Sequence, residues 1–185
     1  LIGYIYVIIF TSKTPIIMNL IYPVLFVTLL FVSCKPKTDS AANEVFEKNS
    51  KTVLAYLEGY QKENVDYSSF SKDFKSLGTS FGAKDTLSLS EFIENDRIEF
   101  ERFNLKLLEK TPVFLPGVNS DTKTLDGSVR LYSTWEISIA KTDSTEAKSG
   151  ELKMYESYDF DANGKILYHQ LYGDFTGLKM YLTSK

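Results

Sequence analysis

Residues 128–139 read SVRLYSTWEISI, a stretch in which apolar and polar side chains alternate with a period of two. Successive side chains of a strand point to opposite faces of a sheet, so the alternation predicts one long, half-buried strand. Two more strands are expected at 151–160 and 165–175, joined by the turn DANG at 161–164. Asn-Gly between alternating segments favours a hairpin because both residues tolerate positive φ. The C-terminal half is therefore predicted to be an antiparallel meander.

The N-terminal half of the domain has helical periodicity instead. Its clearest start signal is the capping box Ser88-Leu-Ser-Glu91, which opens a helix whose acidic and basic residues, Asp96 among them, are expected to face solvent. Helices that precede a meander pack on one face of its sheet, so the predicted class is α+β, with about three helices on a curved antiparallel sheet. The expected elements are a helix at 44–62, a short helix at 67–74, a strand at 76–81, a helix at 89–103 and a strand at 105–118 broken at Pro112 and Pro116.

The first 33 residues differ in composition from the rest, because Lys13 is their one charged residue. The apolar run at 20–32 is shorter than the roughly 20 residues of a membrane-spanning helix, so it predicts the hydrophobic region of a signal peptide. The run ends in Phe31-Val32-Ser33-Cys34, and the chain then turns polar at once. An uncleaved anchor through 1–32 is the alternative, although it would place Lys13 at mid-bilayer, which is costly.

The segment 18–34 resembles the lipobox of bacterial lipoproteins, in which the cysteine is acylated and becomes the first mature residue. We expect translation to start at Met18, which makes 1–17 upstream sequence and the rest of 1–33 the signal peptide; the alternative is a longer leader in which Lys13 supplies the positive charge near its start. Residues 34–43 are then expected to form a lipidated tether. It implies a lipid-anchored protein of the bacterial cell envelope, facing the periplasm or the cell surface. The lipid bilayer, reached through acylated Cys34, is then a partner.

Charge and cysteine content exclude several classes of protein. The 185 residues carry a formal net charge of −3, and without 1–33 there are 20 basic against 24 acidic residues. An acidic domain lacks the Lys and Arg excess that nucleic-acid binding requires. With Cys34 as the only cysteine and His169 as the only histidine, neither a disulfide within the chain nor a zinc site is expected. No metal or cofactor is predicted.

The end of the chain, FDANGKILYHQLYGDFTGL at 160–178, resembles the nuclear transport factor 2-like superfamily in its SnoaL-like branch. Its Gly164-Lys165-Ile166 turn precedes the last strand, which runs on to Tyr172-Gly173-Asp174. The resemblance covers about 44–182 and makes 44–185 the domain. It implies a cone-shaped half-barrel whose concave face, covered by helices, forms one pocket, often within a homodimer packed sheet to sheet. Members include isomerases, dehydratases, epoxide hydrolases and pocket proteins without a known reaction.

Four residues are candidates for the site. His169 shares strand parity with apolar neighbours, so it is either a pocket base or a core histidine satisfied by one hydrogen bond. Glu156 lies on the apolar side of its strand, where an unpaired carboxylate is costly, so a pocket or interface position is favoured. Trp135 and Tyr158 are expected in the core or on the pocket wall.

Two more specific chemistries are not supported by the residues present. In the epoxide hydrolase branch, the central strand carries an Arg-x-Asp pair and the last strand carries a further Asp. In this chain the corresponding positions fall near Ser133, Trp135 and Leu171, so these charged residues are missing. The turn at 159–164 resembles the start of a calcium-binding EF-hand loop, but Gln170 stands where the bidentate Glu is needed.

The main expectation is therefore a membrane-anchored domain without a reaction of its own, which binds a small apolar ligand. The first alternative is a SnoaL-like isomerase, dehydratase or hydratase that uses His169 and Glu156 as base and acid. The second is a dimeric interaction module of the cell envelope. The first two are distinguished by whether Glu156 and His169 face one cavity.

Overall fold

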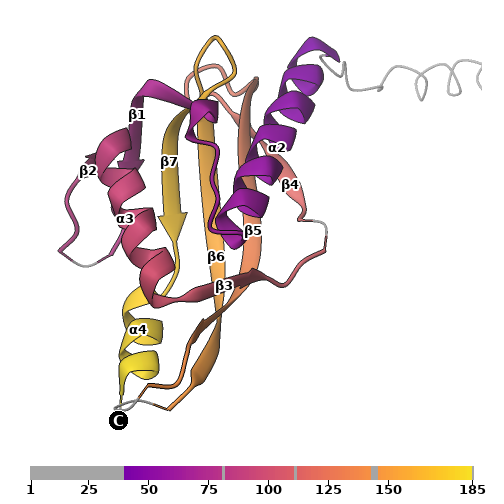
Figure 1. The fold of residues 1–185 in the computed structure, drawn as a ribbon. Coiled ribbons are helices and arrows are strands. Elements are labelled where there is room, and N and C mark those ends of the chain that lie inside the picture. The colour runs from indigo at the N-terminus through magenta and orange to yellow at the C-terminus, as the bar shows by residue number, and fades with distance from the viewer. Residues whose placement is uncertain (1–39, 81, 111, 143–145, 185) are drawn as a thin grey trace, which may run out of the picture. The chain divides into compact units, whose positions relative to one another are not determined.

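One seven-stranded mixed sheet organises the computed structural model, which describes residues 40–80, 82–110, 112–142 and 146–184. The strand order is β2-β1-β7-β6-β5-β3, and β4 pairs with β5 off this path (Figure 1). In chain order the elements are α2 (Ser40–Gln61), the 3₁₀ turn η1 (Tyr67–Ser69), β1 (Phe70–Leu77), β2 (Thr86–Ser88), α3 (Leu89–Arg102), β3 (Asn104–Leu107), β4 (Phe114–Val118), β5 (Leu125–Ile139), β6 (Lys148–Phe160), β7 (Ile166–Tyr172) and α4 (Phe175–Thr183).

The predicted meander is confirmed. β5 pairs with β6 and β6 with β7, both antiparallel, and the register sets Trp135 opposite Leu152 and Tyr158 opposite His169. Along β5 the inward side chains are buried, whereas Tyr132 on the outer face is 66% exposed. The alternation of 128–139 therefore reports one face turned to the core and one turned outward.

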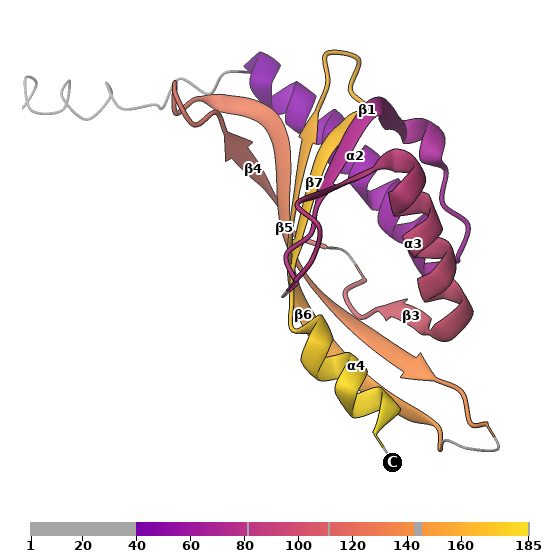
Figure 2. The same ribbon diagram turned by 90° about the vertical axis from the view of Figure 1, so that its left-hand side faces the viewer.

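The helices of the described domain lie on one face of the sheet, as the sequence predicts (Figure 2). α2 and α3 cover the upper part of that face and α4 the lower part (Figure 2). The capping box at the start of α3 is present, with Ser88 accepting from the Glu91 amide and the Glu91 carboxylate accepting from the Ser88 amide. The predicted α+β arrangement, helices on a curved sheet, is confirmed.

The expected short helix at 67–74 is wrong. Only the 3₁₀ turn η1 forms there, after Asp66 caps it, and Phe70 then begins β1. Phe70 and Phe74 are four residues apart, a spacing that puts two side chains on one face of a helix and equally on one face of a strand. β1 then pairs with β7 in parallel, so the sheet is mixed rather than antiparallel.

Other differences concern element ends. The expected strand at 105–118 is two strands, β3 and β4, which pair with different parts of β5 on either side of Pro112. Residues after Asp174 form α4, whose first turn is capped by the Asp174 side chain. α2 begins at Ser40, four residues before the predicted helix and inside the expected tether.

Met18 and Cys34 lie outside the described residues. Within that described part of the chain, no helix has the length and apolar character needed to cross a membrane.

Candidate active site

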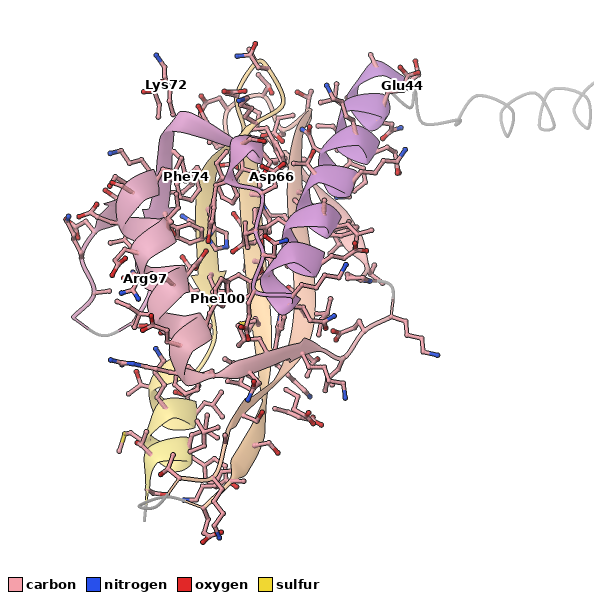
Figure 3. All side chains as sticks on the ribbon, in the orientation of Figure 1. Glu44, Asp66, Lys72, Phe74, Arg97 and Phe100 are labelled. Carbon is pink, nitrogen blue, oxygen red and sulfur yellow. The ribbon has the colours of Figure 1, made fainter. Side chains whose placement is uncertain are left out.

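A cavity of about 260 Å³ lies between the concave face of the sheet and the helices. Its wall is mostly aromatic and aliphatic, and Phe92 of α3 and Tyr60 of α2 belong to it. In Figure 3, Phe100 lies on the side of α3 turned toward the rest of the domain and Arg97 on its outer side, while Phe74 belongs to β1. The polar side chains on the wall are Tyr56, Tyr60, Ser76, Thr79, Ser80, Asn95, Asp96, Glu99, Glu156, His169 and Lys179.

Three of the four candidate residues lie on this wall. Trp135, Glu156 and His169 come from β5, β6 and β7, three neighbouring strands, and each is at most 3% exposed. Tyr158 lies behind the wall with no exposed surface and contacts two of the others. The meander therefore brings the candidates together, because each sits at an inward position of its strand.

Glu156 is the centre of a buried hydrogen-bond network. The Ser133 hydroxyl donates to its Oε1 at 2.6 Å, and the Tyr158 hydroxyl donates to its Oε2. Trp135 Nε1 donates in turn to the Ser133 hydroxyl at 3.2 Å. Burial raises the pKa of the Glu156 carboxyl, and the hydrogen bonds from Ser133 and Tyr158 oppose that rise. Both carboxyl oxygens are thus engaged by the protein, which fixes the side chain in place.

His169 has a different environment, made mainly of aromatic rings. Its imidazole stacks on the Tyr158 ring, with centroids 4.8 Å apart, and the edges of Tyr56 and Phe92 pack around it. Nδ1 is 3.4 Å from the Ser76 hydroxyl, whereas the buried Nε2 has no hydrogen-bond partner among the described residues. Burial lowers the pKa of His169 to about 4, so the ring is neutral at neutral pH.

Asp96 of α3 is a site residue that the sequence analysis placed on the solvent side. It is 4% exposed, lines the cavity and accepts a hydrogen bond from the Tyr67 hydroxyl to Oδ2 at 2.8 Å. Burial raises the pKa of its carboxyl to about 7; the Tyr67 hydrogen bond opposes this and the charge of Glu99 adds to it. The sequence contains a pattern that predicts this burial. Asp96 stands four residues from both Phe92 and Phe100 and therefore shares their apolar helix face.

These groups fit proton transfer. A carboxyl with a pKa near 7 is available at neutral pH both as a base and, once protonated, as an acid. The cavity is apolar enough to take a small, largely apolar molecule against that carboxyl. In the described residues, no three His, Cys, Asp or Glu side chains are grouped as metal ligands would be.

No protein-family model matches the chain, and no curated protein matches it in sequence. Solved structures do match its fold. A putative polyketide cyclase from Xanthomonas campestris pv. campestris superposes with a TM-score of 0.57 at 15% identity, covering 76% of this chain and 99% of its own. A putative isomerase from Bacillus subtilis gives 0.59 at 9% identity, with 75% and 94% covered. A putative SnoaL-like polyketide cyclase from Jannaschia sp. CCS1 gives 0.53 at 11% identity, with 75% and 94% covered.

The expectation of a pocket without a reaction of its own is corrected by these neighbours, which are named as cyclases and an isomerase and so favour the enzyme alternative. The distinguishing geometry agrees with that alternative, since Glu156 and His169 face one cavity. At sequence identities of 9–15%, structural similarity establishes the fold alone. The chain has the α+β, nuclear transport factor 2-like fold of SnoaL-like polyketide cyclases.

Proposed function

We propose that this protein is an acid–base enzyme of the isomerase, dehydratase or hydratase type, acting on a small, largely apolar molecule. The observation that carries the proposal is Asp96, a buried carboxyl whose pKa is raised to about 7 and which faces an apolar cavity. Asp96 takes the role of the base, because the low pKa of His169 makes that ring a weak base and Glu156 is already bonded through both oxygens.

The reaction uses the Asp96 carboxyl in two roles, first as a base and then, once protonated, as an acid. The Asp96 carboxylate removes a proton from a carbon of the substrate, and the electron pair of the broken C–H bond moves into the adjacent unsaturated system. In an isomerisation, the Asp96 carboxylic acid returns the proton at another atom. In a dehydration, it protonates a departing hydroxyl, a double bond forms and water leaves. The Tyr67 hydroxyl holds Asp96 Oδ2 while this happens.

Proton abstraction can be tested with 1-tetralone, a flat bicyclic ketone whose acidic C–H bonds stand next to the carbonyl. We expect the protein to accelerate deuterium uptake at that carbon in D₂O, followed by NMR, with a rate that rises with pH through about 7. Asp96→Asn is expected to slow uptake by roughly 10²-fold or more. Asp85→Asn, at an exposed aspartate, serves as the control. Uptake no faster than in buffer, or equal in Asp96→Asn, contradicts the proposal.

We also propose, from the lipobox resemblance, that the domain is held at the bacterial cell envelope by acylated Cys34. Support comes from the run at 20–32 and the polar residues after the cysteine. Mass spectrometry of the protein isolated from membranes is expected to show a diacyl or triacyl adduct that begins at Cys34. A membrane-isolated protein that carries no acyl adduct at Cys34 would contradict the anchor.

A second copy of the chain is the partner we propose for the outer face of the sheet. Tyr132, Tyr155 and Tyr172 form a row across β5, β6 and β7, with successive ring centroids 5.2 and 6.3 Å apart. Tyr132 is 66% and Tyr172 46% exposed. Tyrosine is enriched in interfaces, and such a row can pack on its own copy about a two-fold axis. Sedimentation is expected to report a dimer that Tyr132→Ser with Tyr172→Ser converts to monomer; a monomeric parent chain contradicts it.

A further inference from the structure

A second hollow of the domain lies between α2 and the turn η1, with a volume of about 420 Å³. This α2 groove is lined by charged and hydroxyl side chains, among them Lys48, Lys51, Thr52, Asp66 and Ser69. We propose that the α2 groove binds the phosphoethanolamine headgroup of a membrane lipid, with the phosphate at Lys48 and Lys51 and the ammonium at Asp66. The inference goes beyond the proposed reaction and takes its source of ligand from the proposed lipid anchor.

The cationic wall of the groove belongs to α2. Lys48 and Lys51 stand three residues apart, which places them on one face of the helix. Glu44 and Glu47 each stand four residues before one of these lysines, the order in which Glu–Lys pairs are most favourable. Neither ion pair forms in the part of the chain that the structure describes. Both lysines line the groove instead, where their charges are available to an anion.

The anionic wall is the carboxylate of Asp66, in the turn that follows α2 (Figure 3). Hydrogen bonds from Ser68 hold the pKa of this carboxyl below its usual range, so Asp66 is ionised at neutral pH. The charge of Lys165 acts in the same direction, although no ion pair joins the two side chains among the described residues. Asp66 is exposed, so a ligand cation can reach it from solvent.

Opposite charges on two walls favour a zwitterion over a simple ion. An anion held by the lysines would also meet the Asp66 carboxylate, and a cation held by Asp66 would meet the two lysines. Phosphoethanolamine carries a phosphate and an ammonium joined by a two-carbon link, so each of its charges has an opposite partner in the groove. Lysine is a common phosphate ligand in proteins, which fits the assignment of the two ends.

The length of chain before α2 favours a lipid as the source of this headgroup. Six residues lead from Cys34 to Ser40, the first residue of α2, and six residues span at most about 20 Å. Lys48 stands eight residues further on, about 12 Å along the helix. An acyl anchor at Cys34 therefore holds this end of α2 close to the headgroup layer of the bilayer.

Binding of the headgroup can be followed by amide NMR of the full chain, titrated with sn-glycero-3-phosphoethanolamine. We expect the signals of residues 48–52 and 66–69 to shift. Two comparison compounds each carry one of the charges: sn-glycero-3-phosphoglycerol has the phosphodiester, and ethanolamine has the ammonium. Each is expected to bind about threefold to fivefold more weakly, because one ion pair is missing. No shift in the groove, or equal affinity for all three compounds, would overturn the inference.

Substitutions assign the two ends of the headgroup. Lys48→Gln with Lys51→Gln is expected to weaken binding of both phosphodiesters. Asp66→Asn keeps an oxygen that can cap η1, and it should remove the preference for the phosphoethanolamine compound over the phosphoglycerol compound. Lys62→Gln, at an exposed lysine just after α2, is the control and should change neither affinity. Equal losses in the control and the double variant, or a preference that survives in Asp66→Asn, would overturn the assignment.

Bilayer discs then identify the source of the ligand. The chain isolated from membranes should show the same groove shifts in discs that contain phosphatidylethanolamine and lack them in discs of phosphatidylglycerol. Shifts with the soluble headgroup but not in phosphatidylethanolamine discs would make a free zwitterion the ligand and overturn the lipid assignment. The other proposals are tested separately, since deuterium uptake should be unchanged in Lys48→Gln with Lys51→Gln and the acyl adduct is read by mass.

Discussion

The Tyr158 ring stacks on the His169 imidazole with an interplanar angle of 26°, while the hydroxyl of the same tyrosine donates to Glu156. One fully buried side chain therefore touches both titratable groups that β6 and β7 place on the cavity wall. Its ring orients the imidazole, and its hydroxyl satisfies one oxygen of the carboxyl. These two functions can be separated, because a phenylalanine keeps the ring and loses the hydroxyl.

Tyr158→Phe is expected to lower the free energy of unfolding by about 1–2 kcal/mol, because Glu156 loses a buried hydrogen bond. It should also raise the pKa of Glu156 further, since that bond opposes the effect of burial. The ¹⁵N signals of His169 should move little, because the stack remains. Urea denaturation and NMR check both effects. Tyr155→Phe, on the outer face, is the control, and an equal loss in the two variants would contradict the network.

Ser133→Ala is expected to cost more than an average serine substitution. The change removes the donor to Glu156 Oε1 and the acceptor of Trp135 Nε1, so two buried groups lose their partners. A loss of about 2 kcal/mol or more follows from the cost of leaving such groups unpaired. Ser138→Ala, half-buried on the same strand, should stay within about 0.5 kcal/mol. Equal losses at the two serines in urea denaturation would show that the network contributes nothing.

Asp96→Asn is expected to stabilise the protein at alkaline pH. The folded state raises the pKa of Asp96 from its ordinary 3.8 to about 7, so ionisation of this carboxyl opposes folding. The penalty is absent below pH 3.8, grows as pH rises toward 7 and is complete above it. At 1.36 kcal/mol per pKa unit it amounts to roughly 4 kcal/mol at most.

Thermal or urea unfolding at pH 5 and pH 8 checks the Asp96 prediction. The advantage of Asp96→Asn over the unsubstituted chain should be larger at pH 8, and the activity lost should accompany the stability gained. Asp85→Asn, at an exposed site, should show no such pH dependence. An Asn variant less stable at pH 8 than at pH 5, relative to the parent, contradicts a raised pKa.

Gly127→Ala is expected to loosen the contact of α2 with β5. Gly127 has a φ of +77°, and an added Cβ would stand 2.5 Å from Cγ1 of Val45 in α2. Its carbonyl also accepts a buried hydrogen bond from Asn49 at 2.8 Å. Gly82 has a similar φ of +73° with open space around it, so Gly82→Ala measures the backbone cost alone, about 1–2 kcal/mol. Gly127→Ala should lose clearly more stability in urea denaturation; losses equal to those of Gly82→Ala would exclude the steric contribution.

The elements that could be predicted are those whose pattern has one interpretation. The alternation in 128–139 and the Asn-Gly turn predicted the meander correctly, and the capping box at Ser88 predicted the start of α3. The spacing of Phe70 and Phe74 fits both a helix and a strand, and the helix was the wrong choice. What favoured a strand was pairing with β7, some 90 residues later, which local sequence cannot reveal.

The sequence by itself determined the inward positions of Trp135, Glu156 and His169, because strand parity is a local property of the chain. Only the tertiary structure decided what those positions do. It packed α3 against the sheet, so that Asp96 lost its water and acquired a raised pKa. It also left His169 Nε2 unpaired beside a cavity. Desolvation and hydrogen bonding depend on which distant segments meet, and so the chemistry of the site follows from the fold rather than from any one stretch of residues.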